Sequence, residues 1–317
     1  MELEKNTYLK NREYSMEIRK LDAFCKVIEL KSFTRAAKAM LLSQPTVSEH
    51  IRYLEDELSQ KLLERQGREV EPTPVGTVLY DYARKILQTR REAIQAVEQF
   101  SGKLAGRITI GCGTIPGTYI LPELVGNFHK KYPAIKTTLR INSSRFIAEE
   151  VLGGNLEFGV VGAKWNEPGL SWKKIFSDEL ILISCPNHLW TDKEAVSLAE
   201  ILREPIITRE RGSGTRKVFA KILVENGFRE QDLQEVAEIG STAAVKETVK
   251  AGIGVAILSK RAVKDDIQCG KLVSIAIKNQ KLKRPFYLIQ RKNRELSPVA
   301  SAFLKFMQEK ASLMKNT

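Results

Sequence analysis

The sequence of 317 residues has few of the residues that build metal sites, disulfide frameworks or nucleophilic active sites. Its four cysteines form no C-x-x-C pair, and its three histidines show no zinc-site spacing. We therefore expect reduced cysteines, no metal, no cofactor and no enzyme activity. The residues concerned are Cys25, Cys112, Cys185, Cys269, His50, His129 and His188.

Long apolar runs are also missing. No stretch reaches the roughly 18 consecutive apolar residues typical of a membrane-spanning helix, and residues 1–15 lack the apolar block of a signal peptide. The sequence predicts a cytoplasmic protein without a membrane partner. With 43% hydrophobic residues, the chain has enough apolar material to fold. Its length predicts two folded units and a connector, because one hydrophobic core rarely grows so large.

Acidic charge is scarce only in the C-terminal part of the chain. The net charge is +13. Residues 1–105 contain 18 Lys and Arg against 16 Asp and Glu, whereas the remainder contains 33 against 22. This excess predicts an anionic partner, but it lies mainly outside the N-terminal part. Evidence for DNA binding must therefore come from the local sequence pattern.

Residues 16–76 contain the pattern of two short helices followed by a capped third one. Apolar residues in LDAFCKVI share one helical face, and the small residues of FTRAAKAM allow close helix packing. Ser43 is placed as the N-cap of the third helix, and Pro45 lies in its first turn. Apolar residues from Val47 to Leu58 recur at helical spacing. The pattern predicts a helix-turn-helix.

The solvent face of this third helix carries short polar side chains that suit base edges and phosphates. A single Ser or Thr there is more simply a solvated residue, but the joint placement on a capped helix predicts DNA binding. Two arginines around Gly67 predict a β-ribbon wing that contacts phosphates. The candidate DNA-binding residues are Thr34, Arg35, Ser43, Gln44, Pro45, Thr46, Ser48, Arg52, Arg65 and Arg68.

Residues 77–104 contain no proline and an apolar stripe at helical spacing. They predict an amphipathic helix roughly 40 Å long, whose stripe we interpret as a dimer seam. The alternative is a helix packed on its own domain, which Arg90 favours because it interrupts the stripe. The stripe comprises Leu79, Ala83, Ile86, Ala93, Ile94, Val97, Phe100 and Leu104.

Residues 105–317 alternate short apolar runs with helix-length segments, which predicts an α/β domain. Two glycine-containing loops, at Thr114 and at Gly212–Thr215, predict helix N-termini that attract anions. Simple N-capping is the alternative for each Ser or Thr. GCGTIPG lacks the dinucleotide-binding spacing, and RGSGTRK is neither a P-loop nor a nucleophile turn, so both motifs argue against catalysis.

The segment LDAFCKVIELKSFTRAAKAMLLSQPTVSEHIRYLEDELSQKLLERQGREVEPTPVG resembles the winged helix-turn-helix of LysR-type transcriptional regulators. The similarity continues through ITIGCGTIPGTYILPELVGNFHKKYPAIKTTLRI and extends from Met16 to the last helix. Ser59 and Leu63 stand where the family commonly has Gly and Phe. The resemblance implies a regulator that binds a double-stranded DNA operator as a homodimer or homotetramer. It also implies a periplasmic-binding-protein-like (type 2) effector domain, with two subdomains joined by crossing strands.

The resemblance places the effector between the two subdomains, and the helix N-termini and the basic charge of this part predict that it is a small anion. Two alternatives from other classes are a solute-binding receptor of a transport system and a DNA-binding protein without a sensor. The expected parts are an N-terminal extension (1–15), the winged helix-turn-helix (16–76), the linker and dimerisation helix (77–104) and the effector domain (105–317), with subdomain 1 at about 106–178 and 283–317 and subdomain 2 at about 179–282. The candidate effector residues are Thr114, Ser143, Ser144, Gly162, Ser213, Gly214, Thr215 and Thr242.

Overall fold

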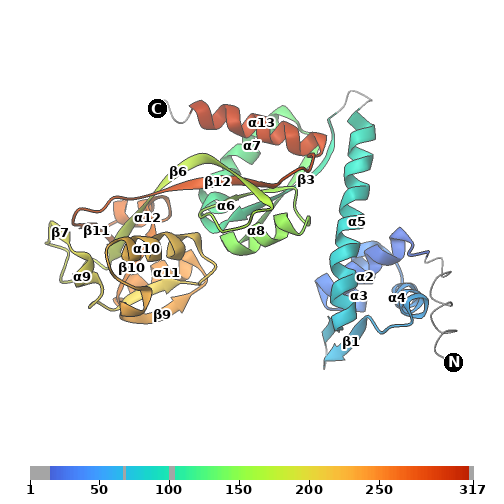
Figure 1. Cartoon of the computed structure of the whole chain (residues 1–317), viewed down its shortest axis with the longest axis horizontal. Helices are drawn as coiled ribbons and strands as arrows, with labels where there is room; N and C mark the ends of the chain where they lie inside the picture. The colour runs from blue at the N-terminus through green and yellow to red at the C-terminus, as the bar shows by residue number, and fades with distance from the viewer. Residues whose placement is uncertain (1–14, 67–68, 100–103, 314–317) are drawn as a thin grey trace. The chain divides into compact units, whose positions relative to one another are not determined.

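The computed structural model describes residues 15–66, 69–99 and 104–313 (Figure 1). The chain divides into two compact units, Met1–Ile94 and Gln95–Thr317, which are described separately below. Within the described ranges, no helix is long and apolar enough to cross a membrane.

Three short helices form the core of the first unit, as the sequence predicted. Phe24 of the first helix and Ala36 of the second are fully buried with Val47 and Leu54 of the third. The second helix starts at an N-cap, Ser32, whose hydroxyl accepts a hydrogen bond from the Arg35 N–H at 3.3 Å. The helices are α2 (Ile18–Leu30), α3 (Phe33–Met40) and α4 (Gln44–Leu58).

All three helices end at a residue in the left-handed conformation, at Lys31, Leu41 and Ser59, with φ angles of 49°, 57° and 53°. A left-handed residue stops a helix because its N–H turns back to the last free carbonyl groups. Ser59 therefore occupies a position where glycine would meet no steric penalty. These ends allow each helix to change direction within a few residues.

The predicted wing is an antiparallel pair of strands, β1 (Leu63–Gln66) and β2 (Glu69–Pro72). Glu55 of α4 is buried and fixes the start of β1, since its carboxylate accepts a hydrogen bond from the Leu62 N–H at 2.9 Å. After β2 the chain passes close to Leu62 at Gly76. A side chain would clash at this position, because a Cβ atom there would lie 1.9 Å from the Leu62 carbonyl oxygen.

The long helix α5 (Pro74–Gln99) begins three residues before the predicted start at residue 77, and residues 100–103 beyond it lie outside the described structure. Its apolar stripe has two roles. Ala83 is buried in the core of the first unit, whereas Ile86, Ile94 and Val97 are exposed, Val97 to 71%. Packing of α5 on its own unit, the alternative to a dimer seam, therefore explains the buried part of the stripe but not the exposed part.

The second unit contains one long mixed sheet with helices around it (Figure 1). The strand order is β4-β3-β5-β12-β6-β10-β8-β9, and β11 pairs with both β6 and β7. The first lobe comprises β3 (Gly106–Gly113), α6 (Thr114–Tyr119), α7 (Leu121–Lys131), β4 (Ile135–Asn142), α8 (Ser144–Leu152), β5 (Phe158–Val161) and α13 (Pro298–Leu313). The second comprises β7 (Ala195–Val196), α9 (Leu198–Ile201), β8 (Ile206–Arg209), α10 (Gly214–Glu225), η1 (Glu230–Asp232), β9 (Glu235–Ile239), α11 (Thr242–Lys250), β10 (Val255–Ser259), α12 (Lys260–Gln268) and β11 (Val273–Ile277).

Two long antiparallel strands, β6 (Leu170–Ser184) and β12 (Leu282–Arg291), connect these lobes and run side by side in Figure 1. Their first-lobe ends continue the sheet through β5, and their second-lobe ends continue it through β10 and β11. The expected α/β fold, with two subdomains joined by two crossing strands, is confirmed. The lobes can be linked in this way because the long strands belong to both.

Candidate DNA-reading surface and effector cleft

The first turn of α4 has the geometry that the sequence predicted. The Ser43 hydroxyl accepts a hydrogen bond from the Thr46 N–H at 3.2 Å and so caps the helix. Gln44 donates from its side-chain amide to the Ser48 hydroxyl at 2.7 Å. Arg52 lies further along the helix, exposed, with its Nε 3.9 Å from an Asp56 carboxylate oxygen. Such polar groups on an exposed helix can bond base edges and phosphates.

The remaining candidate DNA-binding residues surround this turn or belong to the wing. Thr34 and Arg35 are exposed in the first turn of α3, and Pro45 is exposed in α4. Arg65 lies in β1, but its side chain is outside the described structure, and Arg68 lies outside the described residues altogether. The roles of both arginines in contacting phosphates remain predictions.

Lys31, which the sequence analysis did not single out, ties the wing to α2. Its ammonium group lies 2.9 Å from a Glu69 carboxylate oxygen and 3.3 Å from one of Glu71. These hydrogen bonds raise the pKa of Lys31, and the same contact lowers the pKa of Glu69. Lys31 and the two glutamates lie far apart in the sequence, so helical spacing could not predict these contacts.

A small cavity lies between the two lobes of the second unit, and seven of the eight candidate effector residues line it. Its volume of about 10 Å³ is close to the roughly 10 to 15 Å³ needed for one water molecule. The cleft is therefore closed in this structure. The seven residues are Thr114, Ser143, Ser144, Gly162, Ser213, Gly214 and Thr215.

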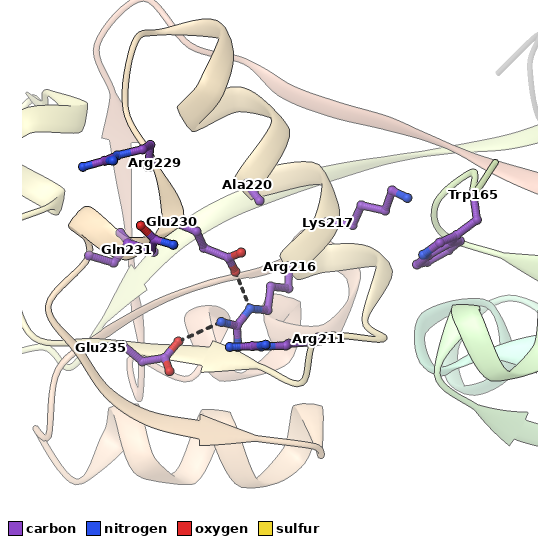
Figure 2. Close-up of a pocket in the computed structure, with 10 residues that line it drawn as sticks. Trp165, Arg211, Arg216, Lys217, Ala220, Arg229, Glu230, Gln231 and Glu235 are labelled. Atoms are coloured by element: carbon purple, nitrogen blue, oxygen red, sulfur yellow. Dashed lines mark hydrogen bonds and ion pairs between the residues drawn. The ribbon is translucent and has the colours of Figure 1, made fainter.

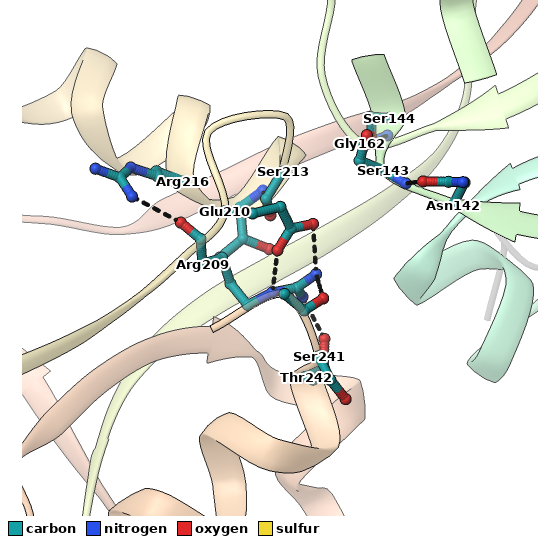
Figure 3. Close-up of polar contacts among 12 residues, drawn as sticks. Asn142, Ser143, Ser144, Gly162, Arg209, Glu210, Ser213, Arg216, Ser241 and Thr242 are labelled. Atoms are coloured by element: carbon teal, nitrogen blue, oxygen red, sulfur yellow. Dashed lines mark hydrogen bonds and ion pairs between the residues drawn. The ribbon is translucent and has the colours of Figure 1, made fainter. Parts of the chain in front are cut away.

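Two helix N-termini face each other across this cleft, those of α8 and α10 (Figure 3). The Ser143 hydroxyl accepts from the Phe146 N–H at 3.3 Å, and the Ser213 hydroxyl accepts from the Thr215 N–H at 3.2 Å. Capping, the simpler interpretation of these serines, therefore applies to both. Each hydroxyl keeps its own proton and can still donate it to a ligand.

Direct contacts hold the lobes together at the cleft. The Arg145 N–H donates to the Gly212 carbonyl oxygen at 3.3 Å. A Cβ atom on Gly214 would lie 2.9 Å from the Gly162 carbonyl carbon, so the two backbones meet where neither residue has a side chain. On the first lobe, the Ser144 hydroxyl accepts from the Gly162 N–H at 3.1 Å. Any ligand larger than water must separate these surfaces before it enters.

Arg284, one partner of an ion pair between the connecting strands, lines the cavity. Arg284 of β12 and Asp178 of β6 are register partners whose side chains are only 2% and 1% exposed. Arg284 donates to one Asp178 carboxylate oxygen from Nε at 2.9 Å and from Nη2 at 2.7 Å, and its Nη1 donates to the Thr215 hydroxyl at 3.0 Å. Burial lowers the pKa of Arg284, while Asp178 opposes that shift.

A second buried arginine, Arg209, also lines the cavity, and like Arg284 it was missed by the sequence analysis as a site residue. Its guanidinium donates to the Thr242 hydroxyl, to the Gly240 carbonyl oxygen at 2.9 Å and to the Glu210 carboxylate at 2.9 Å. The eighth candidate, Thr242, does not line the cavity. It instead holds Arg209 in place (Figure 3).

The site offers cationic and hydroxyl donors rather than metal ligands. Among the residues that the structure describes, no group of three or more His, Cys, Asp or Glu side chains is arranged to hold a metal ion. Seryl and threonyl hydroxyls, helix N–H groups and guanidinium groups all favour an anion. The arrangement suits reversible binding of a small molecule.

The fold and the two sites together define a DNA-binding protein with a ligand-binding domain. Residues 18–77 match the model of the bacterial regulatory helix-turn-helix proteins of the lysR family, and residues 101–312 match the LysR substrate binding domain. The chain therefore belongs to the LysR family of transcriptional regulators, which are not enzymes. The helix-turn-helix match also argues against a solute-binding receptor.

Several known proteins resemble the chain over most of its length. It is 28% identical over 299 residues to the RuBisCO operon transcriptional regulator of Allochromatium vinosum, covering 94% of this chain and 98% of that protein. Full-length CbnR in complex with its target DNA has a TM-score of 0.68 at 21% identity, with 93% and 99% of the two chains covered. The Synechocystis PCC6803 CcmR regulatory domain in complex with 2-PG has a TM-score of 0.60 at 23% identity, with 65% and 97% covered.

Proposed function

We propose that this LysR-type regulator reads its operator with the first turn of α4 and senses a small anion in the cleft between the lobes of its effector domain. Contacts from the wing add affinity through phosphates, independently of sequence. The cleft ligand shifts the balance between a closed and an open arrangement of the lobes. It can do so only by the difference between its affinities for the two arrangements.

The observation that carries the anion assignment is the set of donors around the cavity. Arg209 and Arg284 are both buried there, and Thr114 has a hydroxyl without a hydrogen-bond partner within the described structure. The N-termini of α8 and α10 add partial positive charge. In the closed cleft, Asp178 and Glu210 already compensate the charges of the two arginines. An anion must therefore bind hydrogen-bond donors that these two carboxylates do not occupy. The CcmR regulatory domain in complex with 2-PG supports a ligand site in this fold.

A thermal-shift screen of small anions against the full chain identifies the ligand, because binding to the native state raises the unfolding midpoint. Calorimetry then compares the wild type with Thr114→Val. Loss of one hydrogen bond to a charged group costs about 1.5 to 3 kcal/mol, so the affinity should fall at least roughly tenfold. Thr118→Val is the matched control, since Thr118 is exposed in the same short helix and does not line the cavity. A neutral effector, or unchanged binding by Thr114→Val, contradicts the proposal.

We also propose that α5 joins two copies into a homodimer, which pairs further into a homotetramer. Ile86, Ile94 and Val97 support this because they expose apolar surface on one long helix. Replacing Ile94 and Val97 by Asp should lower the mass measured by light scattering. A soluble variant of unchanged mass counts against the seam.

A further inference from the structure

A second and much larger cavity, called the outer cavity below, is lined by residues of α10 and of neighbouring segments (Figure 2). Its volume is about 770 Å³, within the range of about 300 to 1,000 Å³ that small-molecule sites occupy. Residues of α10 and η1 line it from the second lobe, and Trp165 lines it from the loop after β5 of the first lobe. The cavity is therefore large enough for an organic molecule while the cleft is closed.

The acidic side chains of this cavity are already paired with one arginine. Arg216 contacts Glu230, lies 3.2 Å from a Glu235 carboxylate oxygen, and also pairs with Glu238 (Figure 2 shows the first two contacts). Burial works against the charge of Arg216, but these three carboxylates outweigh it and raise its pKa. The charge of Arg216 is therefore compensated within this cluster and is not available to an anionic ligand.

Two other cations of the cavity, Arg211 and Lys217, differ from Arg216 in this respect. Arg211 and Lys217 have no acidic partner in the part of the chain that the structure describes. The Lys217 ammonium lies over the Trp165 ring at 4.4 Å from its centroid. Burial, together with the nearby charge of Arg145, lowers the pKa of Lys217. An anion beside Lys217 would stabilise a charge that the protein alone leaves poorly compensated.

We propose that this cavity is a second binding site, separate from the cleft, for an organic polyanion bearing several phosphate or carboxylate groups. Arg211 and Lys217 bind one end of the ligand, and Arg229, whose exposed guanidinium lies 3.3 Å from an Asp232 carboxylate oxygen, binds the other. Guanidinium groups suit both anion types because they donate two parallel hydrogen bonds. Ala220 and Leu233 provide an apolar wall for the carbon skeleton.

Helix α10 links this site to the cleft. Ser213 and Thr215, at its N-terminus, line the cleft, and Lys217 and Ala220, in its next turn, line the outer cavity. A ligand in the outer cavity also contacts Trp165 of the opposite lobe, so it favours one spacing of the two lobes. Each ligand then changes the affinity for the other by the same factor, as linkage requires.

The test uses calorimetry on the full chain with inorganic tripolyphosphate and citrate as probes and inorganic phosphate as the weak reference. We expect at least one probe to bind more tightly than phosphate, and the stronger one indicates whether phosphate or carboxylate groups are preferred. The double variant Arg211→Ala/Arg229→Ala should lose about tenfold or more in affinity, the value expected for removal of one charged hydrogen bond. The variant Thr114→Val should bind the probe normally, which separates this site from the cleft.

The control is Lys271→Ala/Lys281→Ala, which removes the same charge from exposed residues that do not line the cavity. It should change probe affinity by less than about twofold if the binding is local. Equal losses in both double variants would indicate general charge attraction. Unchanged binding in the cavity variant would place the probe elsewhere, for example on the DNA-binding unit. Either of these two results overturns the proposal, and so does a failure of both probes to bind. If the alanine variant is unfolded, Arg211→Gln/Arg229→Gln replaces it.

Discussion

The DNA-binding unit and the effector unit build their sites in opposite ways. The candidate DNA-reading residues on α3 and α4 lie between Thr34 and Arg52, on exposed helix faces. The residues around the effector cleft come from segments between Thr114 and Phe286 and are brought together by both lobes and both connecting strands. A site on one capped helix depends on local geometry, whereas a site between lobes depends on the whole fold.

Each unit also contains a buried feature that a single substitution can test. The effector unit contains a buried ion pair, Asp178 with Arg284, whose charges depend on each other. The DNA-binding unit contains a close backbone approach at Gly76, which depends on the absence of a side chain. Substitutions at these positions should therefore damage one unit and spare the other.

The largest expected effect is that of Asp178→Ala, which leaves the Arg284 guanidinium buried without its carboxylate. Removing one partner of a buried pair typically costs about 3 to 5 kcal/mol, so the effector unit should lose that much stability. Urea unfolding followed by tryptophan fluorescence measures this unit alone, because Trp165, Trp172 and Trp190 are the three tryptophans of the chain and all lie within it.

A double variant separates the effect of charge compensation from that of packing. In Asp178→Leu/Arg284→Leu neither charge of the pair remains, and replacing a buried pair by apolar residues is often close to neutral. The double variant should therefore be more stable than Asp178→Ala. If both lose the same stability, the charges of the pair do not explain the cost.

Gly76→Ala should produce the next largest effect, in the DNA-binding unit. The new methyl group would lie 1.9 Å from the Leu62 carbonyl oxygen, so α5 and β1 must move apart. Overpacking of this kind costs about 1 to 3 kcal/mol and sometimes more. We expect a loss of about 3 kcal/mol, because the methyl group meets a backbone atom that cannot move away as a flexible side chain would. Hydrogen exchange of α2, α3 and α4 should accelerate, while the tryptophan transition of the effector unit stays unchanged.

Gly126→Ala in the effector unit is the matched control. Gly126 lies inside α7, and a Cβ atom there meets nothing within 4 Å. Alanine should therefore stabilise this helix by up to about 1 kcal/mol, because glycine is the poorer helix former. Destabilisation by both substitutions would mean that close approach at Gly76 is not the cause.

Sequence reasoning worked best where function and local structure coincide. Capping by Ser43 and the apolar spacing from Val47 to Leu58 depend only on neighbours within a helix, and α4 has the predicted start and buried face. The helix N-termini at Thr114 and at the Gly212–Thr215 loop were also predicted from local sequence, and α6 and α10 begin there. Their meeting at one cavity followed only from the family resemblance.

What the sequence left out depends on contacts between distant segments. Arg284 pairs with Asp178 because β12 and β6 run antiparallel in one register, and nothing near either residue in the sequence indicates that pairing. Glu55, in a polar stretch of α4, is buried because β1 folds back onto it. Thr242 follows the pattern of a ligand-binding turn, but its hydroxyl is occupied by Arg209.

A third prediction tests whether DNA discrimination is as local as the exposed position of α4 implies. Gln44→Ala should cost about 1 to 3 kcal/mol of discrimination between operator and unrelated DNA for each base whose hydrogen bonds to Gln44 are removed. Arg65→Ala should instead weaken binding to all sequences and reduce the salt slope by about one unit, as expected for a phosphate-binding side chain. Affinities measured at several salt concentrations distinguish the two behaviours.

Thr114→Val provides the comparison from the effector unit. It should leave DNA affinity unchanged without effector and alter only the response to the effector. If Gln44→Ala leaves the discrimination intact, the first turn of α4 does not read bases. If Arg65→Ala changes sequence preference, the wing does more than contact the backbone.

The smallest expected effects concern one left-handed residue in each unit. Leu41, after α3, has a φ of 57° and is 93% exposed, and Asn279, before β12, has the same φ. The left-handed region costs an ordinary side chain about 1 to 2 kcal/mol, whereas asparagine tolerates it. Glycine removes that cost but adds about 0.5 to 1 kcal/mol of backbone entropy. Leu41→Gly should therefore stabilise its unit by about 0.5 kcal/mol, and Asn279→Gly should be neutral or slightly destabilising. Hydrogen exchange of α3 and tryptophan-detected unfolding measure the two changes. A loss of stability in Leu41→Gly would mean that this exposed side chain contributes more to the helix-turn-helix than its backbone conformation costs.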